Sequence, residues 1–241
     1  MLNLEGSGLS GELPPLSHLS ALQVFDVSNN ECEGTLGPDW ARMLNLTDLS
    51  LSYNFFSGPL LERNLPPNLE ALYANNNRFS GSPNLSNLKR LRTLNLRGNR
   101  LSGVVPDLAL PKLETLQLGA NAALSGTVPP FAALTLLQTL ELAETNVTGI
   151  RAIFVCRHSA HRFSDAGDVP SFEHMKRLQS VDLSHCRLTG SIHLRNPTLR
   201  TLDISSNEFP IDLAFLAHLP NLTALTRSEE HTSELQSHLN L

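Results

Sequence analysis

Three residues of the chain have a spacing that could bind a metal ion. Cys156, His158 and His161 form the pattern Cys-x-His-x-x-His, and a thiolate and two imidazoles this close together are able to coordinate zinc. A zinc site of this kind needs a fourth ligand, and no supporting Cys or His pattern accompanies these residues. We therefore interpret them as incidental, and we predict no bound metal and no other cofactor.

The other residues capable of acid–base or nucleophilic chemistry do not converge on a catalytic site. The remaining histidines are scattered along the chain, without the Ser, Cys or carboxylate pattern that a nucleophile site requires. No glycine-rich phosphate loop is present, because the recurrent Ser-Gly steps suit tight turns. The sequence therefore predicts that this chain is not an enzyme.

Noncovalent recognition is the chemistry that remains, and a repeat determines where its residues lie. The pattern Leu-x-x-Leu-x-Leu-x-x-Asn-x-Leu recurs with a period of about 21 to 24 residues, apart from one longer step. Leu94 and Leu96 alternate with polar residues, which predicts a short strand with one buried face. One turn cannot cover its own leucines, so the turns must stack into a solenoid. The pattern opens at Leu22, Leu46, Leu69, Leu91, Leu113, Leu137, Leu178, Leu199 and Leu222.

A polar residue follows each predicted strand where the chain bends. Asn99 holds this position in the turn that opens at Leu91, and its amide is able to pair with backbone groups that the bend leaves unbonded. Stacking then predicts a ladder of such residues through the solenoid. The equivalent residues are Asn30, Asn54, Asn77, Asn121 and Asn207, with Ser7, Thr145 and Cys186 as smaller polar substitutes.

A second signature, an apolar residue followed by Ser-Gly or Thr-Gly, comes after the ladder position. It begins at Leu9, Phe56, Phe79, Leu101, Leu124, Val147 and Leu188. The combined pattern resembles the plant-type leucine-rich repeats of receptor-like kinases, receptor-like proteins and polygalacturonase inhibitors. The resemblance implies an α/β fold: a right-handed solenoid with a concave parallel sheet, a second short strand at the Ser-Gly segment, and short helical or irregular convex turns. The segments 37–43 and 169–175 also resemble repeats of kinetoplastid surface antigens.

The repeats divide the chain into one solenoid and two irregular segments. The solenoid covers residues 1–226, and residues 150–168 interrupt it with an insert whose removal restores the period. This insert is a retained intron, a functional loop or a disordered excursion. Residues 227–241 break the pattern and match the in-frame translation of a common sequencing-library adapter, so we exclude them from the fold and expect no packing of Leu235 and Leu239 against the Leu222 layer.

The net charge argues against a nucleic-acid partner, and the sequence motifs favour an extracellular or cell-surface location. The formal net charge is −5. The tail contains one Arg and three Glu, and the insert contains three Arg and two Asp. Without these two segments the formal net charge is −4, which argues against a nucleic-acid partner. No apolar run is long enough to span a membrane. Asn45, Asn84, Asn146 and Asn221 begin N-glycosylation sequons, which favour secretion or membrane anchoring of the intact protein over a cytoplasmic location.

The outward face of the concave sheet is the predicted binding surface. Its acidic bias favours a basic or polar protein or peptide partner, although charges on such a face also serve solubility. We expect the central residues Tyr53, Glu70, Tyr73, Asn95, Gln117 and Glu141 to contact the ligand. The predicted function is non-catalytic recognition by a fragment of a cell-surface receptor. The alternatives are a secreted inhibitor of a cell-wall hydrolase and the ectodomain of a receptor kinase.

Overall fold

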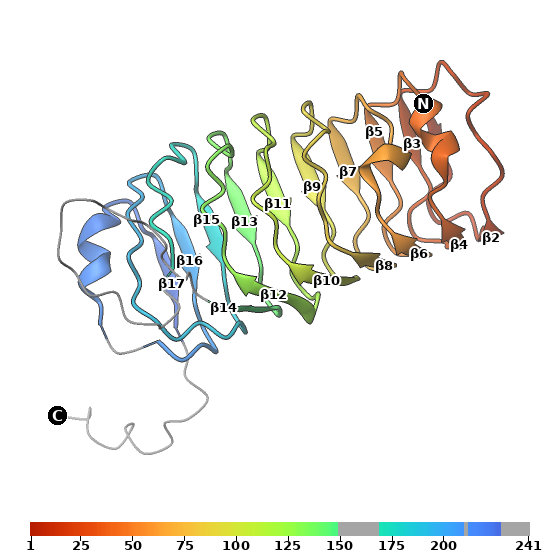
Figure 1. Cartoon of the computed structure of the whole chain (residues 1–241). Coiled ribbons are helices and arrows are strands. Elements are labelled where there is room, and N and C mark those ends of the chain that lie inside the picture. Colours follow the sequence, from red (N-terminus) through yellow and green to blue (C-terminus); the bar gives the residue numbers. More distant parts are fainter. Residues whose placement is uncertain (149–168, 210–211, 228–241) are drawn as a thin grey trace.

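A computed structural model of the chain describes residues 1–148, 169–209 and 212–227. Its main element is a parallel sheet of ten short strands that stand side by side along the solenoid (Figure 1). Each repeat contributes one strand, so the order in space is the order in the chain. The strands are β1 (Leu2–Asn3), β3 (Val24–Asp26), β5 (Asp48–Ser50), β7 (Ala71–Tyr73), β9 (Thr93–Asn95), β11 (Thr115–Gln117), β13 (Thr139–Glu141), β15 (Ser180–Asp182), β16 (Thr201–Asp203) and β17 (Ala224–Thr226).

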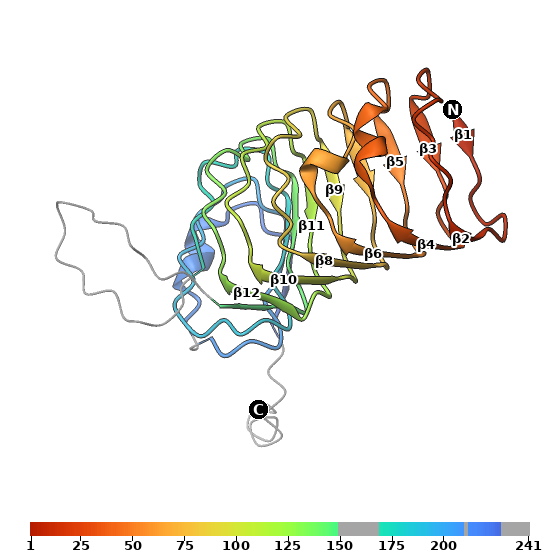
Figure 2. The same cartoon turned by 45° about the vertical axis from the view of Figure 1, so that its right-hand side comes forward.

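Six Ser-Gly or Thr-Gly segments and the Glu-Gly segment at 33–34 form a second parallel sheet of seven strands along one flank of the solenoid (Figure 2). Its strands are β2 (Ser10–Glu12), β4 (Glu31–Thr35), β6 (Phe55–Pro59), β8 (Arg78–Gly81), β10 (Arg100–Val104), β12 (Ala123–Thr127) and β14 (Asn146–Thr148). In the described part of the chain, the helices are three short 3-10 helices, η1 (Pro38–Arg42), η2 (Glu62–Asn64) and η3 (Ala214–His218). The predicted leucine-rich-repeat solenoid is confirmed. The predicted second strand forms at six of the seven Ser-Gly or Thr-Gly segments, and the segment that begins at Leu188 forms no strand.

The register of the concave sheet stacks the repeat leucines into continuous apolar columns. Leu72 pairs with Leu94, Leu94 with Leu116, and Leu116 with Leu140, and all four side chains are fully buried. Burying a leucine side chain contributes about 1.5–3 kcal/mol. Because each turn covers the leucines of its neighbours, this contribution depends on stacking.

The predicted asparagine ladder bonds each asparagine-containing turn to the one before it. The Asn99 carboxamide oxygen accepts a hydrogen bond from the Phe79 N–H at 3.0 Å, and its Nδ2 donates to the carbonyls of Ala74 at 2.9 Å and Leu96 at 3.0 Å. Asn30, Asn54, Asn77, Asn121 and Asn207 repeat this arrangement. At Thr145 the hydroxyl donates to the Leu142 carbonyl within its own turn, at 2.8 Å, and shares a hydrogen bond with the Cys186 sulfur of the next turn, at 3.6 Å.

The residue before the ladder position has a left-handed backbone in turn after turn. Gly98 has a φ of 67°, and non-glycine residues adopt the same conformation at the equivalent positions, including Tyr53 at 55° and Glu144 at 59°. This conformation is sterically unfavourable for residues with a Cβ. The bend that it produces directs the following side chain into the core, where the ladder forms.

Several predictions concern residues that the structure does not describe. Cys156, His158, His161 and the rest of 149–168 lie outside the described residues, as do Leu235, Leu239 and the rest of 228–241. The interpretations of the insert and of the tail therefore stay predictions. Cys32 and Cys186, which the structure does describe, are buried free cysteines.

The ladder leads to a stability prediction for Asn99→Ala. The substitution leaves the buried Phe79 N–H unpaired, and a buried unpaired group costs about 1–3 kcal/mol. It also removes one amide bond from each of the Ala74 and Leu96 carbonyls, which keep bonds from Asn77 and Asn121. We expect the free energy of unfolding to fall by at least about 2 kcal/mol in denaturant titration. Asn95→Ala is the control, because Asn95 accepts one bond, from the half-buried Arg97 N–H. An equal loss in both variants would contradict the role of the ladder.

Candidate functional site

Four of the predicted binding residues form one continuous row across the concave sheet. Tyr73 is paired in register with Asn95, Asn95 with Gln117, and Gln117 with Glu141. Neighbouring strands lie about 4.8 Å apart, so the row presents its side chains at a constant spacing on a rigid backbone. We call these four residues the central row.

Tyr53 lies outside the central row. It follows β5 at the left-handed bend, and its N–H donates to the Asn75 carbonyl at 2.9 Å, whereas Tyr73 is aligned with Ser50. Three residues of strand separate Ser50 from Tyr53, a distance of about 10 Å. The side chains are both accessible, with 56% of Tyr53 and 41% of Tyr73 exposed. The two tyrosines therefore lie on adjacent turns but on different lines of the face.

Glu141 is the predicted residue whose environment differs most from the expectation. Only 7% of it is exposed, because the Arg97 guanidinium, which comes from two turns away, forms an ion pair with its carboxylate and a second one with Glu144 at 2.5 Å. Gly119 provides the space between them, since a Cβ at this position would lie 1.9 Å from the Glu141 Oε1. A ligand can reach Glu141 only if Arg97 moves.

Burial controls the protonation of this cluster. Burial raises the pKa of the Glu141 carboxyl, and the charge of Asp182 adds to that rise, while the Arg97 charge opposes it. For Arg97, burial alone would lower the pKa, but the charges of Glu141 and Glu144 raise it. In the described part of the chain, the Glu141 Oε2 is the one buried side-chain oxygen or nitrogen without a hydrogen-bond partner. Arg97 therefore stays charged, and ionised Glu141 carries the cost of burial.

Glu70 also has an internal partner. The Arg92 Nε lies 3.6 Å from its Oε2, and the Arg92 Nη1 lies 2.6 Å from the Glu114 Oε1. Gln138 continues this series of bonded side chains, because its Nε2 donates to the Glu114 Oε2 at 3.0 Å. These side chains are half-exposed, so each pair contributes at most about 1 kcal/mol to stability. Glu70 and Glu114 therefore add less net negative charge to the face than the sequence suggests.

The acidic residues toward the ends of the sheet are not paired in this way. Among the described residues, Asp26, Asp48, Asp182 and Asp203 take part in no ion pair. Asp182 and Asp203 are direct register neighbours that continue the central row beyond Glu141. Each accepts a hydrogen bond from the N–H two residues further on, which orients the carboxylate. The acidic character expected for the whole face is thus concentrated at its ends.

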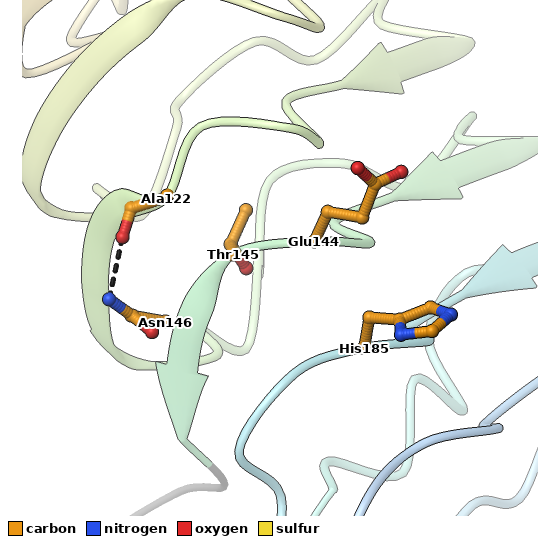
Figure 3. Close-up of a pocket in the computed structure, with 5 residues that line it drawn as sticks. All are labelled: Ala122, Glu144, Thr145, Asn146 and His185. Carbon is orange, nitrogen blue, oxygen red and sulfur yellow. Dashed lines mark hydrogen bonds between the residues drawn. The ribbon is translucent and has the colours of Figure 1, made fainter.

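Three of the four predicted glycosylation asparagines are exposed. They are Asn45, Asn84 and Asn221. Asn146 is half-buried, and its Nδ2 donates to the Ala122 carbonyl at 2.6 Å (Figure 3). The Nδ2 atoms of Asn45 and Asn221 also donate to carbonyls, of Ser20 and Pro197, so Asn146 differs from the other sequons in its lower exposure.

Asn146 lines an open pocket of about 430 Å³ beyond the ends of β13 and β15. Glu144 and His185 come from neighbouring turns, and their side chains extend along the same wall (Figure 3). Glu144 is bonded to Arg97, and the Thr145 hydroxyl is bonded to the Leu142 carbonyl. These two groups are therefore already engaged within the protein, and the pocket offers polar contacts to a ligand.

Sequence reasoning missed a basic pocket at the opposite ends of the strands. Lys176, Arg177 and Arg200 line a pocket of about 530 Å³, which we call the rim pocket. The signal was present, since two cations directly precede the repeat leucine Leu178 and another follows Leu199. The other lining residues are Gln138, Gln179, Thr198, Asn221 and Thr223.

Two further observations bear on the class of this site. Within the described residues, no three His, Cys, Asp or Glu side chains are grouped so that they could hold a metal ion. Over the same part of the chain, no helix has the length and apolar character needed to cross a membrane.

Comparison with known proteins places this geometry in a family. Sequence models of leucine-rich repeats match residues 67–109, 177–194 and 195–209. Receptor-like protein 18 of Arabidopsis thaliana is 31% identical over 214 residues, which cover 86% of this chain and 24% of that protein. The chain is a plant-type leucine-rich-repeat protein similar to receptor-like proteins. It spans about a quarter of the length of the curated relatives that it matches.

Solved structures show the same fold. The plant peptide hormone receptor RGFR1, in complex with RGF2, matches with a TM-score of 0.68 and 27% identity over 94% of this chain and 36% of the receptor. The Arabidopsis receptor kinase HAESA, in complex with the peptide hormone IDA and the co-receptor SERK1, matches with a TM-score of 0.66 and 26% identity over 93% of this chain and 40% of HAESA.

The raised pKa of Glu141 leads to a pH-dependent prediction for Glu141→Gln. A carboxyl whose folded pKa lies above its ordinary value of 4.5 stabilises the fold below that value, and this contribution is lost as the pH rises through the folded pKa. The variant cannot ionise. We therefore expect its free energy of unfolding, relative to the parent, to increase between pH 4 and pH 7 in denaturant titrations.

Glu12→Gln, which removes an exposed carboxylate at the end of β2, is the control for this experiment. Its stability relative to the parent should change less over the same pH range. A parent protein that gains stability relative to Glu141→Gln as the pH rises would show that the Arg97 ion pair outweighs burial.

Proposed function

We propose that the concave face of this chain recognises a protein or peptide ligand without catalysis, as part of a cell-surface receptor. The observation that carries the proposal is the central row: Tyr73, Asn95 and Gln117 are accessible side chains at one spacing on a rigid parallel sheet. A ligand that lies across the strands meets groups that are already positioned, so little conformational entropy is lost on the protein side. Tyr53 extends the surface toward the second sheet.

The relatives support a peptide as the ligand class. Receptor-like proteins of Arabidopsis thaliana match over most of this chain. Two receptors of the same fold were solved with peptide hormones, RGFR1 with RGF2 and HAESA with IDA. By analogy, an extended peptide along the concave sheet of this chain would use the same type of surface.

The distribution of charge favours a ligand with at least one basic group. Asp182 and Asp203 are oriented by backbone hydrogen bonds and have no ion-pair partner among the described residues. A lysine or arginine of the ligand would gain favourable potential there, mainly in association rate and specificity. Glu70 and Glu141 contribute less because Arg92 and Arg97 neutralise them.

The similarity to receptor-like proteins favours this function over the secreted hydrolase inhibitor. In the receptor-kinase alternative, the solenoid would perform the same recognition step. An extracellular or cell-surface location fits these relatives, and it also fits the exposed sequons at Asn45, Asn84 and Asn221.

The proposal predicts that binding depends on the two tyrosines. A peptide selected from a random display library for binding to the parent protein provides the probe. We expect Tyr73→Ala and Tyr53→Ala each to weaken its binding by about 2 kcal/mol or more, roughly 30-fold in Kd, because exposed tyrosines on a rigid sheet supply large contact area. Calorimetry or interferometry measures the change.

The controls for this experiment lie outside the concave sheet. Arg63→Ala changes an exposed residue of η2, and Lys89→Ala changes an exposed residue in the turn before β9. Both should leave Kd within a factor of about two, as is usual for residues outside an interface. If these variants lost binding while the tyrosine variants retained it, recognition would not use the concave face.

A further inference from the structure

The rim pocket is formed by four successive turns near the C-terminal end of the described solenoid. Gln138, Gln179, Arg200 and Thr223 immediately precede β13, β15, β16 and β17. Main-chain hydrogen bonds of 2.8–2.9 Å join each of these residues to the next. Lys176 and Arg177 project from the turn before β15. One wall of the pocket is thus held by main-chain hydrogen bonds between successive turns, and cations from two of these turns line the pocket.

The cations of the rim pocket lack the partners that other cations of this face possess. Arg92 and Arg97 each contact two carboxylates. Within the ranges that the structure describes, Lys176, Arg177 and Arg200 form no ion pair, although the chain as a whole carries a net charge of −5. Three like charges around one pocket repel each other, and an anionic group between them would relieve that repulsion.

The chemistry of the lining residues suits a carboxylate. Each arginine guanidinium presents a planar set of donors that matches the two oxygens of a carboxylate, and a lysine adds a third cation. Gln179 and Thr223 add polar side chains at the wall. Because all three cations are exposed, a ligand can approach them without any movement of the core.

The acidic residues of the same strands determine the geometry of the ligand. Arg200 and Asp203 lie three residues apart along one strand, as do Gln179 and Asp182 on the neighbouring strand. Three residues of extended chain span about 10 Å. The Arg200 cation and the line of Asp182 and Asp203 therefore lie about 10 Å apart along the strands, too far to neutralise each other directly.

We propose that the rim pocket binds a side-chain carboxylate of a peptide whose basic side chain lies on Asp182 and Asp203. The ligand is then a peptide with an acidic and a basic residue about 10 Å apart, which corresponds to a spacing of about three residues in an extended chain. This inference rests on the proposed recognition function and specifies the charge pattern that the C-terminal turns of the concave face select.

Two charged probes test the proposal separately from the proposed function. The first is an acetylated hexaglutamate peptide and the second is hexalysine, each titrated at low ionic strength by microscale thermophoresis. We expect the triple variant K176Q/R177Q/R200Q to weaken hexaglutamate binding at least about tenfold, because charge-assisted bonds to the carboxylates are lost. The matched control is K89Q/R90Q/K112Q, which removes the same number of charges from the turns before β9 and β11.

The outcomes distinguish binding at the rim pocket from nonspecific electrostatic attraction to the protein surface. Equal weakening in the two triple variants, or no hexaglutamate binding by the parent, would overturn the rim pocket. Hexalysine binding should weaken in D182N/D203N and not in K176Q/R177Q/R200Q. If hexalysine behaves in this way while hexaglutamate binds K176Q/R177Q/R200Q as tightly as the parent, the inference fails and the proposed function stands. If neither probe responds to substitutions on the concave face, both fail.

Discussion

The structure depends on the pairing of backbone groups where each strand bends out of the concave sheet. At that bend, the backbone no longer forms the regular hydrogen bonds of the parallel sheet. A buried carbonyl or N–H that stays unpaired there is costly. In six turns a single asparagine supplies both an acceptor and donors, and it bonds to the preceding turn as well as its own, as Asn99 does with Ala74 and Leu96. The stacking of the leucines, and hence the concave face, follows from this bond.

The ladder weakens in the part of the solenoid where the surface becomes irregular. Thr145 bonds to Leu142 of its own turn and to the Cys186 sulfur of the next turn, at 3.6 Å, and among the described residues it makes no side-chain bond back to the preceding turn. Just before it, an additional residue at Ala122–Ala123 shifts the turn, and the Leu124 N–H bonds to the Asn121 carbonyl instead of a ladder amide. The pocket between Glu144 and His185 opens where these two irregularities meet (Figure 3).

The charges of the concave face divide into those that are paired within the protein and those that remain available to a ligand. In the middle, Arg97 extends over two turns to Glu141 and Glu144, and Arg92 links Glu70 to Glu114. Toward the C-terminal turns, Asp182 and Asp203 lie on one line of the face, and the cations Lys176, Arg177 and Arg200 lie before the strands, at the opposite end. A bound peptide can therefore replace interactions with water there, whereas in the middle it would compete with ion pairs that already exist.

The sequence by itself determined the strands, the buried leucines, the ladder and the family, because each depends on the position of a residue within its own turn. The central row from Tyr73 to Gln117 followed for the same reason. Only the tertiary structure decided that Glu141 is covered, since this requires Arg97 from two turns away and the space above Gly119. It also decided the separation of Tyr53 from that row and the convergence of Lys176, Arg177 and Arg200. Such contacts depend on how far side chains extend between stacked turns, and a repeat pattern within one turn contains no information about that distance.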